Sequence, residues 1–175
     1  MSAVTTGTPL LEASDVVVDY GTRRRPNRVL HEVSLSIGQG ECVGLVGESG
    51  SGKSTLGKAI LGLVPVAGGR ITFDGRDITH AKGRERRALA ADIQVVFQDP
   101  YTSLNPRKTV GDIIGEPFDI HPDAVPKGSR RARVQELLDL VGLNPEHINR
   151  YPHQFSGGQR QRIGVARGIA LNPKV

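Results

Sequence analysis

Residues 47–55, GESGSGKST, are the stretch of this chain whose residue types and spacing are best suited to chemistry. Gly47, four further residues, and then Gly52, Lys53 and Ser54 match the pattern G-x-x-x-x-G-K-[ST], a phosphate-binding loop. Glycines are needed there because backbone N–H groups can converge on a phosphate only where no Cβ prevents unusual φ/ψ values or close approach. The alternative is a glycine-rich turn that binds nothing, in a chain with 22 glycines.

The pattern assigns chemical roles within this loop. Lys53 is predicted to reach the β and γ phosphates of a nucleotide, and the Ser54 hydroxyl to bind Mg²⁺. A helix that starts here would direct its positive end at the same phosphates. The candidate nucleotide-binding residues of the loop are Gly47, Glu48, Ser49, Gly50, Ser51, Gly52, Lys53, Ser54 and Thr55.

A second anion-binding pattern, Ser156-Gly157-Gly158-Gln159, opens the last predicted helix. A serine in the N-cap position and two glycines that expose backbone N–H groups favour a negative ligand. One nucleotide does not need two such sites in the same chain. The second site is explained if it serves a nucleotide held by another subunit, whereas the alternative is an ordinary helix cap.

Strand patterns dominate the first half of the chain. Residues 10–20 and 33–37, followed by 70–73 with a turn at 74–75, predict a small antiparallel sheet, and a basic loop is expected up to Arg28. Residues 41–46 and 93–97 are apolar at nearly every position, which predicts parallel strands covered on both faces. The single cysteine, Cys42, is therefore expected to be buried and inert.

Helical patterns dominate the second half. We expect a short charged helix at residues 83–90 and a helix from residue 56 to about 62 or 64. Further helices are expected at residues 110–118, 129–141 and 159–171, with apolar side chains gathered on one face.

Composition narrows the class of protein. The 175 residues are 37% hydrophobic and 23% charged, and no apolar run approaches the roughly 20 residues of a membrane span. The N-terminus lacks the pattern of a signal peptide, so a cytoplasmic protein is expected. The net charge of +5 permits an acidic partner, but we interpret the arginine clusters near residues 23–28, 84–87 and 130–133 as solvated surface.

Together, these motifs resemble the ATPase subunit of an ATP-binding cassette (ABC) transporter, in which S-G-G-Q is the signature motif. The resemblance covers about residues 10–175. Residues 97–107, FQDPYTSLNPR, and 151–156, YPHQFS, are similar to the subgroup that powers oligopeptide and dipeptide importers. The resemblance implies an α/β fold of the P-loop NTPase class and ABC ATPase type, with a mixed β-sheet lobe and an α-helical lobe.

The resemblance also implies ligands and partners. Tyr20 would stack on the adenine of ATP, and Gln98 would contact Mg²⁺ and the attacking water. Ser156 to Gln159 would contact ATP held by a second ATPase subunit, identical or homologous, paired head to tail. The partners implied are that subunit and membrane permeases, with a solute-binding protein indirectly and no nucleic acid, at the inner face of the cell membrane.

The expected organisation is a disordered segment at residues 1–9 and one ATP-binding domain at 10–175, incomplete at its C-terminus. Within it we expect a sheet lobe at 10–98, a helical lobe at 99–154, and the signature motif with its helix at 155–175. The family's Mg²⁺-supporting aspartate, catalytic glutamate and γ-phosphate-sensing histidine cannot be assigned here, so we expect a partial chain with little hydrolysis of its own. Two rival interpretations are a non-catalytic nucleotide-binding fragment and an ABC-type ATPase that acts on nucleic acid or ribosomes.

Overall fold

The computed structural model describes residues 8–22, 25–99, 103–126 and 128–175. The chain divides into two compact units, Met1–Ala90 and Ala91–Val175, and each is described by itself. Residues 1–7, most of the predicted disordered segment, lie outside the described residues. The lobe boundaries predicted at residues 98 and 154 stay a prediction.

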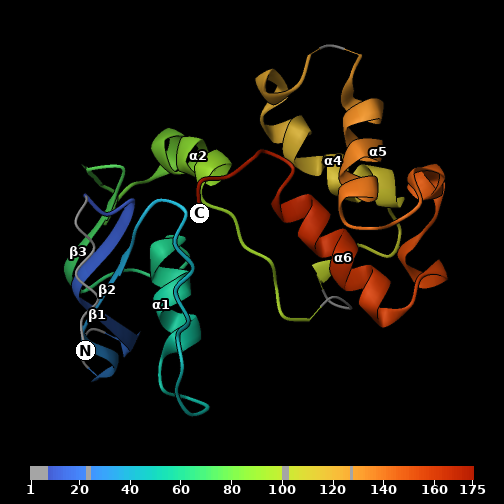
Figure 1. Ribbon diagram of the computed structural model, residues 1–175. Coiled ribbons are helices and arrows are strands. Elements are labelled where there is room, and N and C mark those ends of the chain that lie inside the picture. Colours follow the sequence, from blue (N-terminus) through green and yellow to red (C-terminus); the bar gives the residue numbers. More distant parts are fainter. Residues whose placement is uncertain (1–7, 23–24, 100–102, 127) are drawn as a thin grey trace. The chain divides into compact units, whose positions relative to one another are not determined.

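The first unit is built on an antiparallel sheet with the strand order β2-β1-β3-β4 (Figure 1). The strands are β1 (Leu11–Thr22), β2 (Arg25–Ile37), β3 (Gly68–Phe73) and β4 (Arg76–Asp77). Leu11 pairs with Ile37 on one side and with Phe73 on the other, so β1 is an inner strand of the sheet. The predicted antiparallel sheet and hairpin are thus confirmed, although β2 begins at Arg25, inside the segment predicted as a loop.

Apolar side chains of this sheet pack with helix α1 (Lys53–Ile60), which contacts β1 and β2. Leu56 and Ala59 are the buried residues of α1. Other buried apolar side chains of this unit are Leu11, Val16, Val18, Leu30, Ile71 and Phe73. Helix α2 (Gly83–Asp92) follows the sheet as predicted. The core therefore fixes the start of α1 against β1 and β2.

The two predicted parallel strands are not formed in the described residues. Residues 41–46 and 94–97 carry no strand assignment, and Val46 is 95% exposed. A parallel strand needs hydrogen-bonded neighbours. The described sheet contains only the four strands β1, β2, β3 and β4, and it has no place for residues 41–46 or 94–97. Cys42 is consequently an exposed free thiol, and its predicted burial is wrong.

Residues 92–94, which belong to the second unit, pair with residues 174–175 of the same unit. The Lys174 and Val175 N–H groups donate to the Asp92 carbonyl at 2.8 and 3.0 Å, and the Gln94 N–H donates to the Val175 carbonyl at 2.9 Å. The Val175 N–H bonds to residue 92 and the Val175 carbonyl to residue 94, which is the hydrogen-bond pattern of two parallel strands. The start of the segment 93–97 therefore runs parallel to residues 174–175, although no strand is assigned.

The second unit is a helical core. Its helices are α4 (Val110–Ile120), α5 (Arg130–Leu140) and α6 (Gly157–Gly168), with the 3₁₀ turns η1 (Pro122–Ala124), η2 (Pro145–Asn149) and η3 (Pro152–Gln154). Figure 1 shows α4, α5 and α6 grouped together. The central buried side chains include Ile113, Ile114, Val134, Leu137, Leu138, Ile163 and Ala166. The three predicted helices are confirmed, although α6 starts earlier, at Gly157, and ends at Gly168 rather than at residue 171.

Two leucines of α5 test this core. Leu137 is fully buried, whereas Leu140, one turn later, is 70% exposed. We expect Leu137→Ala to lower the free energy of unfolding by about 3 kcal/mol, from lost burial and a residual cavity. Leu140→Ala is the matched control, with a change within about 0.5 kcal/mol. Urea unfolding followed by circular dichroism measures both, and equal losses would contradict this packing.

Candidate functional site

The loop before α1 is closed on itself by one lysine. Lys53 Nζ donates to the Gly47 carbonyl at 2.7 Å, to the Glu48 carbonyl at 2.6 Å and to Ser51 Oγ at 3.2 Å. The Ser51 N–H donates back to the Glu48 carbonyl at 3.2 Å. These bonds wrap the backbone of residues 47–51 around the ammonium group, so a positive charge lies at the centre of the loop.

The glycines of this loop have the conformations that the motif requires. Gly52 has φ +94°, and Gly50 has φ +84°, a region that side chains with a Cβ rarely adopt. A Cβ on Gly47 would lie 2.8 Å from Ser51 Oγ, and one on Gly52 would lie 2.7 Å from Leu30 Cδ2. The loop therefore sits close to both its own side chains and β2.

The start of α1 leaves donors free for an anion. Gly52 is the N-cap, and it provides no side-chain hydrogen bond to the helix. The first intrahelical bond runs from the Leu56 N–H to the Gly52 carbonyl at 2.9 Å. The N–H groups of Lys53, Ser54 and Thr55 precede that bond, as expected at a helix N-terminus. Together with Lys53 Nζ, they make a positive site suited to phosphate.

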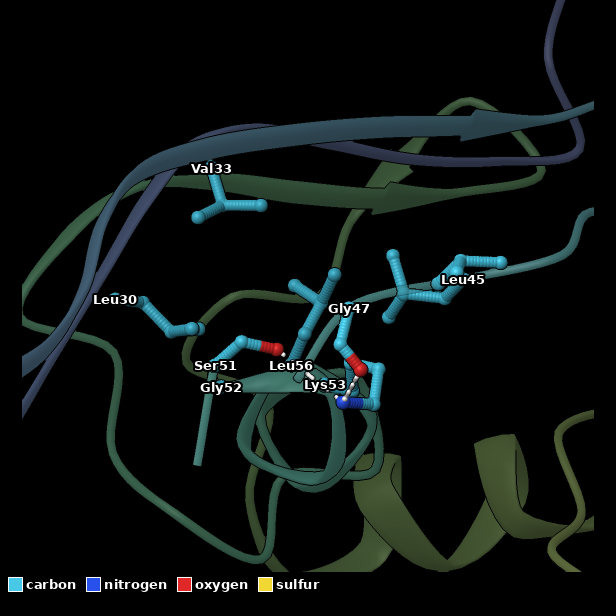
Figure 2. Close-up of a pocket in the computed structure, with 9 residues that line it drawn as sticks. Leu30, Val33, Leu45, Gly47, Ser51, Gly52, Lys53 and Leu56 are labelled. Atoms are coloured by element: carbon cyan, nitrogen blue, oxygen red, sulfur yellow. Dashed lines mark hydrogen bonds between the residues drawn. The ribbon is translucent and has the colours of Figure 1, made fainter. Parts of the chain in front are cut away.

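A pocket of roughly 200 Å³ adjoins this loop (Figure 2). Its polar wall is formed by Gly47, Ser51, Gly52 and Lys53, and Figure 2 shows Lys53 bonded to Gly47 and Ser51 across it. Its apolar wall comprises Leu30, Val33, Leu45, Val46 and Leu56. The sequence motif did not identify Leu30 and Val33. The apolar and polar alternation of β2 was the available signal, because it points one face of that strand toward α1.

The other end of α1 is held by Arg86 of α2. Arg86 donates to the Ile60 carbonyl at 3.1 Å and to the Ile78 carbonyl at 3.0 Å. Burial lowers the pKa of this guanidinium below its usual value. The interpretation of Arg86 as solvated surface is therefore wrong, since it binds the last carbonyl of α1, the helix that starts at the phosphate-binding loop, and the Ile78 carbonyl after β4.

Tyr20 lies near the end of β1, where it pairs with Asn27, and it is 38% exposed. It does not line the pocket beside Lys53. The walls of that pocket therefore come from other residues.

The second anion-binding pattern forms the start of α6. Ser156 is the N-cap: its Oγ accepts from the Gln159 N–H at 3.3 Å, and the Ser156 N–H donates to Gln159 Oε1 at 2.9 Å. The N–H groups of Gly157 and Gly158 precede the first intrahelical bond, which runs from the Arg160 N–H to the Ser156 carbonyl. Ser156, Gly158 and Gln159 are exposed. The helix start is thus capped from within and still presents backbone donors.

Gln98 belongs to the second unit and is exposed. Residues 100–102 of the stretch that follows it lie outside the described residues. The structure thus brings Gly47, Ser51 and Lys53 together in one unit, and places Gln98 and Ser156 in the other.

Metal ligands of the usual kind are not gathered in the described part of the chain. No group of three His, Cys, Asp or Glu side chains there could hold a metal ion. The described helices also include none long and apolar enough to cross a bilayer. A Mg²⁺ ion at this site would depend on hydroxyl and amide oxygens and on phosphate oxygens of a nucleotide.

Comparisons with known proteins agree on one family. A family model described as ABC transporter matches residues 30–175. The dipeptide transport ATP-binding protein DppF of Lactococcus lactis is 52% identical over 87% of this chain and 49% of its own length. The oligopeptide transport ATP-binding protein OppF of Bacillus subtilis is 49% identical over 94% of this chain and 54% of its own. The chain spans about half the length of these curated relatives.

Two further matches are a glutathione import protein and a solved cassette structure, and the second confirms the fold. The glutathione import ATP-binding protein GsiA of Escherichia coli is 50% identical over 98% of this chain and 29% of its own. A solved dimeric structure of the ATP-binding cassette MJ0796, bound to ADP and Pi, matches with a TM-score of 0.82 and 32% identity. That match covers 93% of this chain and 70% of the cassette, and it confirms the predicted fold class.

Two glycines of the loop test the close approach to β2. Gly52→Ala must adopt a positive φ and displace the buried side chain of Leu30, whereas Gly50→Ala has open space around its added Cβ. We expect Gly50→Ala to cost about 1 to 2 kcal/mol of stability from backbone strain alone. Gly52→Ala should cost about 1 to 3 kcal/mol more, from overpacking. Thermal unfolding of both variants measures the difference, and equal costs would show that the loop does not pack on Leu30.

Proposed function

The chain belongs to the ABC transporter family, and from that premise we propose that it is the ATP-binding subunit of an importer of peptides or similar small solutes. The observation that carries the proposal is the pair of anion-binding helix starts in one chain, at Gly52–Lys53 and at Ser156–Gly158. In the proposed mechanism each start contributes to a nucleotide pocket that a second subunit completes.

The residues of the phosphate-binding loop fit ATP and Mg²⁺. Lys53 and the N–H groups at the start of α1 would hold the β and γ phosphates, with the loop residues Gly47, Glu48, Ser49, Gly50, Ser51, Gly52, Ser54 and Thr55 around them. The Ser54 hydroxyl and the Gln98 side-chain oxygen would be ligands of Mg²⁺. The ion would neutralise phosphate charge when bound. The loop is already folded around the ammonium group of Lys53, which supports this assignment.

The remaining candidate residues would complete the pocket. Tyr20 would stack on adenine, consistent with its partial exposure. Gln98 would also orient the attacking water. Ser156, Gly157, Gly158 and Gln159 would contact the nucleotide of the partner subunit through the donors at the start of α6.

The proposed partners are a second ATPase subunit, paired head to tail, and membrane permease subunits, with a solute-binding protein acting indirectly. ATP-driven closure of the pair would be transmitted to the permeases beside Gln98. The proposed location is peripheral, on the inner face of the cell membrane. The solved MJ0796 cassette is a dimer, which supports pairing.

Import is favoured over an action on nucleic acid by two observations. The relatives described above are named for dipeptide, oligopeptide and glutathione transport. Several arginines of the basic clusters also bind within the chain, rather than presenting a free positive face. Arg28 pairs with Asp19 at 3.0 Å, and Arg130 pairs with Asp119 at 2.8 Å.

We expect the 175 residues alone to bind ATP weakly and to hydrolyse it hardly at all. No carboxylate among them has been assigned to polarise the attacking water, and loss of a general base costs about 10²- to 10⁴-fold in rate. Steady-state phosphate release by the purified polypeptide, with Lys53→Ala as the control, measures this. Turnover near one per second that Lys53→Ala abolishes would contradict it.

Two substitutions of Ser156 distinguish its role as a helix cap from its proposed contact with a nucleotide. Ser156→Ala should cost about 1 kcal/mol of stability by removing the cap, whereas Ser156→Asp keeps an acceptor and should preserve stability. The new carboxylate would nevertheless repel a triphosphate, so Ser156→Asp should lose ATP-dependent pairing. Ser129→Asp is the matched control, because Ser129 caps α5 without a side-chain bond.

Sedimentation of the full-length variants with a slowly hydrolysed ATP analogue measures this pairing, and urea unfolding measures stability. Wild-type pairing of the Ser156→Asp variant would remove Ser156 from the proposed pocket.

A further inference from the structure

Helix α6 carries three arginines that bind backbone carbonyls of three different segments. Arg160 Nε donates to the Pro152 and Phe155 carbonyls at 2.9 and 3.0 Å, just before the helix. Arg162 Nη1 donates to the carbonyls of Val141 and Gly142 at 3.4 and 3.2 Å, at the end of α5. Arg167 Nη1 donates to the Ser103 carbonyl at 2.8 Å. The helix that begins at Ser156 is therefore bonded to its surroundings along its whole length.

The last turn of α6 contacts the chain on both sides of Gln98. Arg167 binds Ser103, five residues after Gln98, through a bond that is partly buried. Gly168 is so close to the segment before Gln98 that an added Cβ would lie 2.8 Å from Val96 Cγ2. Gln98 is thus bracketed by two contacts to a single helical turn.

The helix between these contacts and Ser156 is firmly packed. Ile163 and Ala166 are fully buried in the helical core, and Leu104, next to Ser103, belongs to the same buried cluster. Ser156 and Arg167 lie eleven residues apart on one helix, or about three turns. A displacement of the Ser156 end is therefore carried to the Arg167 end by a rigid element rather than by a flexible loop.

We propose that Arg167 is a positioning residue that ties the Gln98 segment to α6, so that nucleotide contact at Ser156–Gly158 repositions Gln98 in the same protomer. The inference rests on the proposed function, in which Gln98 serves the protomer's own ATP and Ser156 serves the partner's. It makes each pocket of the pair sensitive to the occupancy of the other.

Removal of the Arg167 side chain leaves the Ser103 carbonyl without this donor. The segment after Gln98 then loses this contact with α6, whereas the contact of Gly168 with the segment before Gln98 remains. The phosphate-binding loop lies in the other unit and keeps its own bonds. The loss is therefore expected in the chemical step and not in ATP binding. Misplacement of a catalytic group by about 1 Å costs on the order of 10²-fold in rate.

A double-mutant cycle on the full-length protein tests the proposal. Arg167→Ala should lower kcat roughly 10- to 100-fold, with the KM for ATP within about twofold of wild type. In a Gln98→Ala background, Arg167→Ala should cause no further loss, because its effect acts through Gln98. Arg167→Lys should recover part of kcat, since the observed bond uses a single donor. Arg162→Ala is the matched control and should retain wild-type kcat.

Amide hydrogen exchange without nucleotide provides a readout independent of turnover. Arg167→Ala should speed exchange at residues 95–98 and 103–104 by about tenfold or more, as local opening becomes easier. Arg162→Ala should instead speed exchange at residues 141–143. Unchanged exchange at residues 95–98 and 103–104 in Arg167→Ala would overturn the proposed tie.

The outcomes separate the inference from the proposed function. If the full-length wild-type protein shows no turnover that depends on Lys53, the proposed function fails and the inference fails with it. If turnover depends on Lys53 but the losses from Arg167→Ala and Gln98→Ala multiply, only the inference is overturned. Equal loss of kcat in Arg162→Ala would likewise reduce Arg167 to a structural role.

Discussion

Donation from long cationic side chains to backbone carbonyls is the interaction on which the functional segments of this protein depend. Lys53 closes the phosphate-binding loop through two carbonyls, and Arg86 links the last carbonyl of α1 to the Ile78 carbonyl after β4. Irregular segments cannot satisfy their carbonyls in a ladder, and a carbonyl that loses its partner costs about 1 to 3 kcal/mol. Hydrogen bonds from charged donors are stronger than neutral ones, so each cation can fix a stretch of loop against a helix.

The same interaction organises the second unit, with α6 as the donor. An apolar face of α6 is buried with α4 and α5, while its arginines reach over the edges of that core to carbonyls of three segments. Hydrophobic burial fixes where the helix lies, because it supplies most of the stability. The arginines then fix how the irregular segments around it are placed. In this unit, apolar packing therefore positions the helix, and polar contacts position the irregular segments around it.

Local patterns in the sequence predicted the helices well, because periodicity and capping are properties of neighbouring residues. Ser156, for example, was expected as an N-cap and forms the capping box that starts α6. Residues 41–46 were predicted as a buried strand and are exposed, since a strand needs partners from elsewhere in the chain. The tasks of Arg86 and Arg167 were not predicted, because their acceptors lie up to 64 residues away and are backbone atoms without a residue signature.

The candidate site residues were named from motifs, and their surroundings distinguish the two helix starts. At α1 the N-cap is a glycine without a side-chain acceptor, so the N–H groups of Lys53, Ser54 and Thr55 all lack a cap. At α6 the Ser156 side chain already accepts from the Gln159 N–H, and only the Gly157 and Gly158 N–H groups remain. The first start also has a lysine beside it, whereas the second has an exposed serine and glycine.

An anion therefore gains more from the start of α1 than from the start of α6. The second start is satisfied enough to stay folded without a ligand, and it presents too few donors to hold a phosphate strongly alone. It can add to a phosphate that is already bound elsewhere. This asymmetry gives an order of events, in which the phosphate-binding loop takes the nucleotide first and α6 of a partner subunit contacts it second.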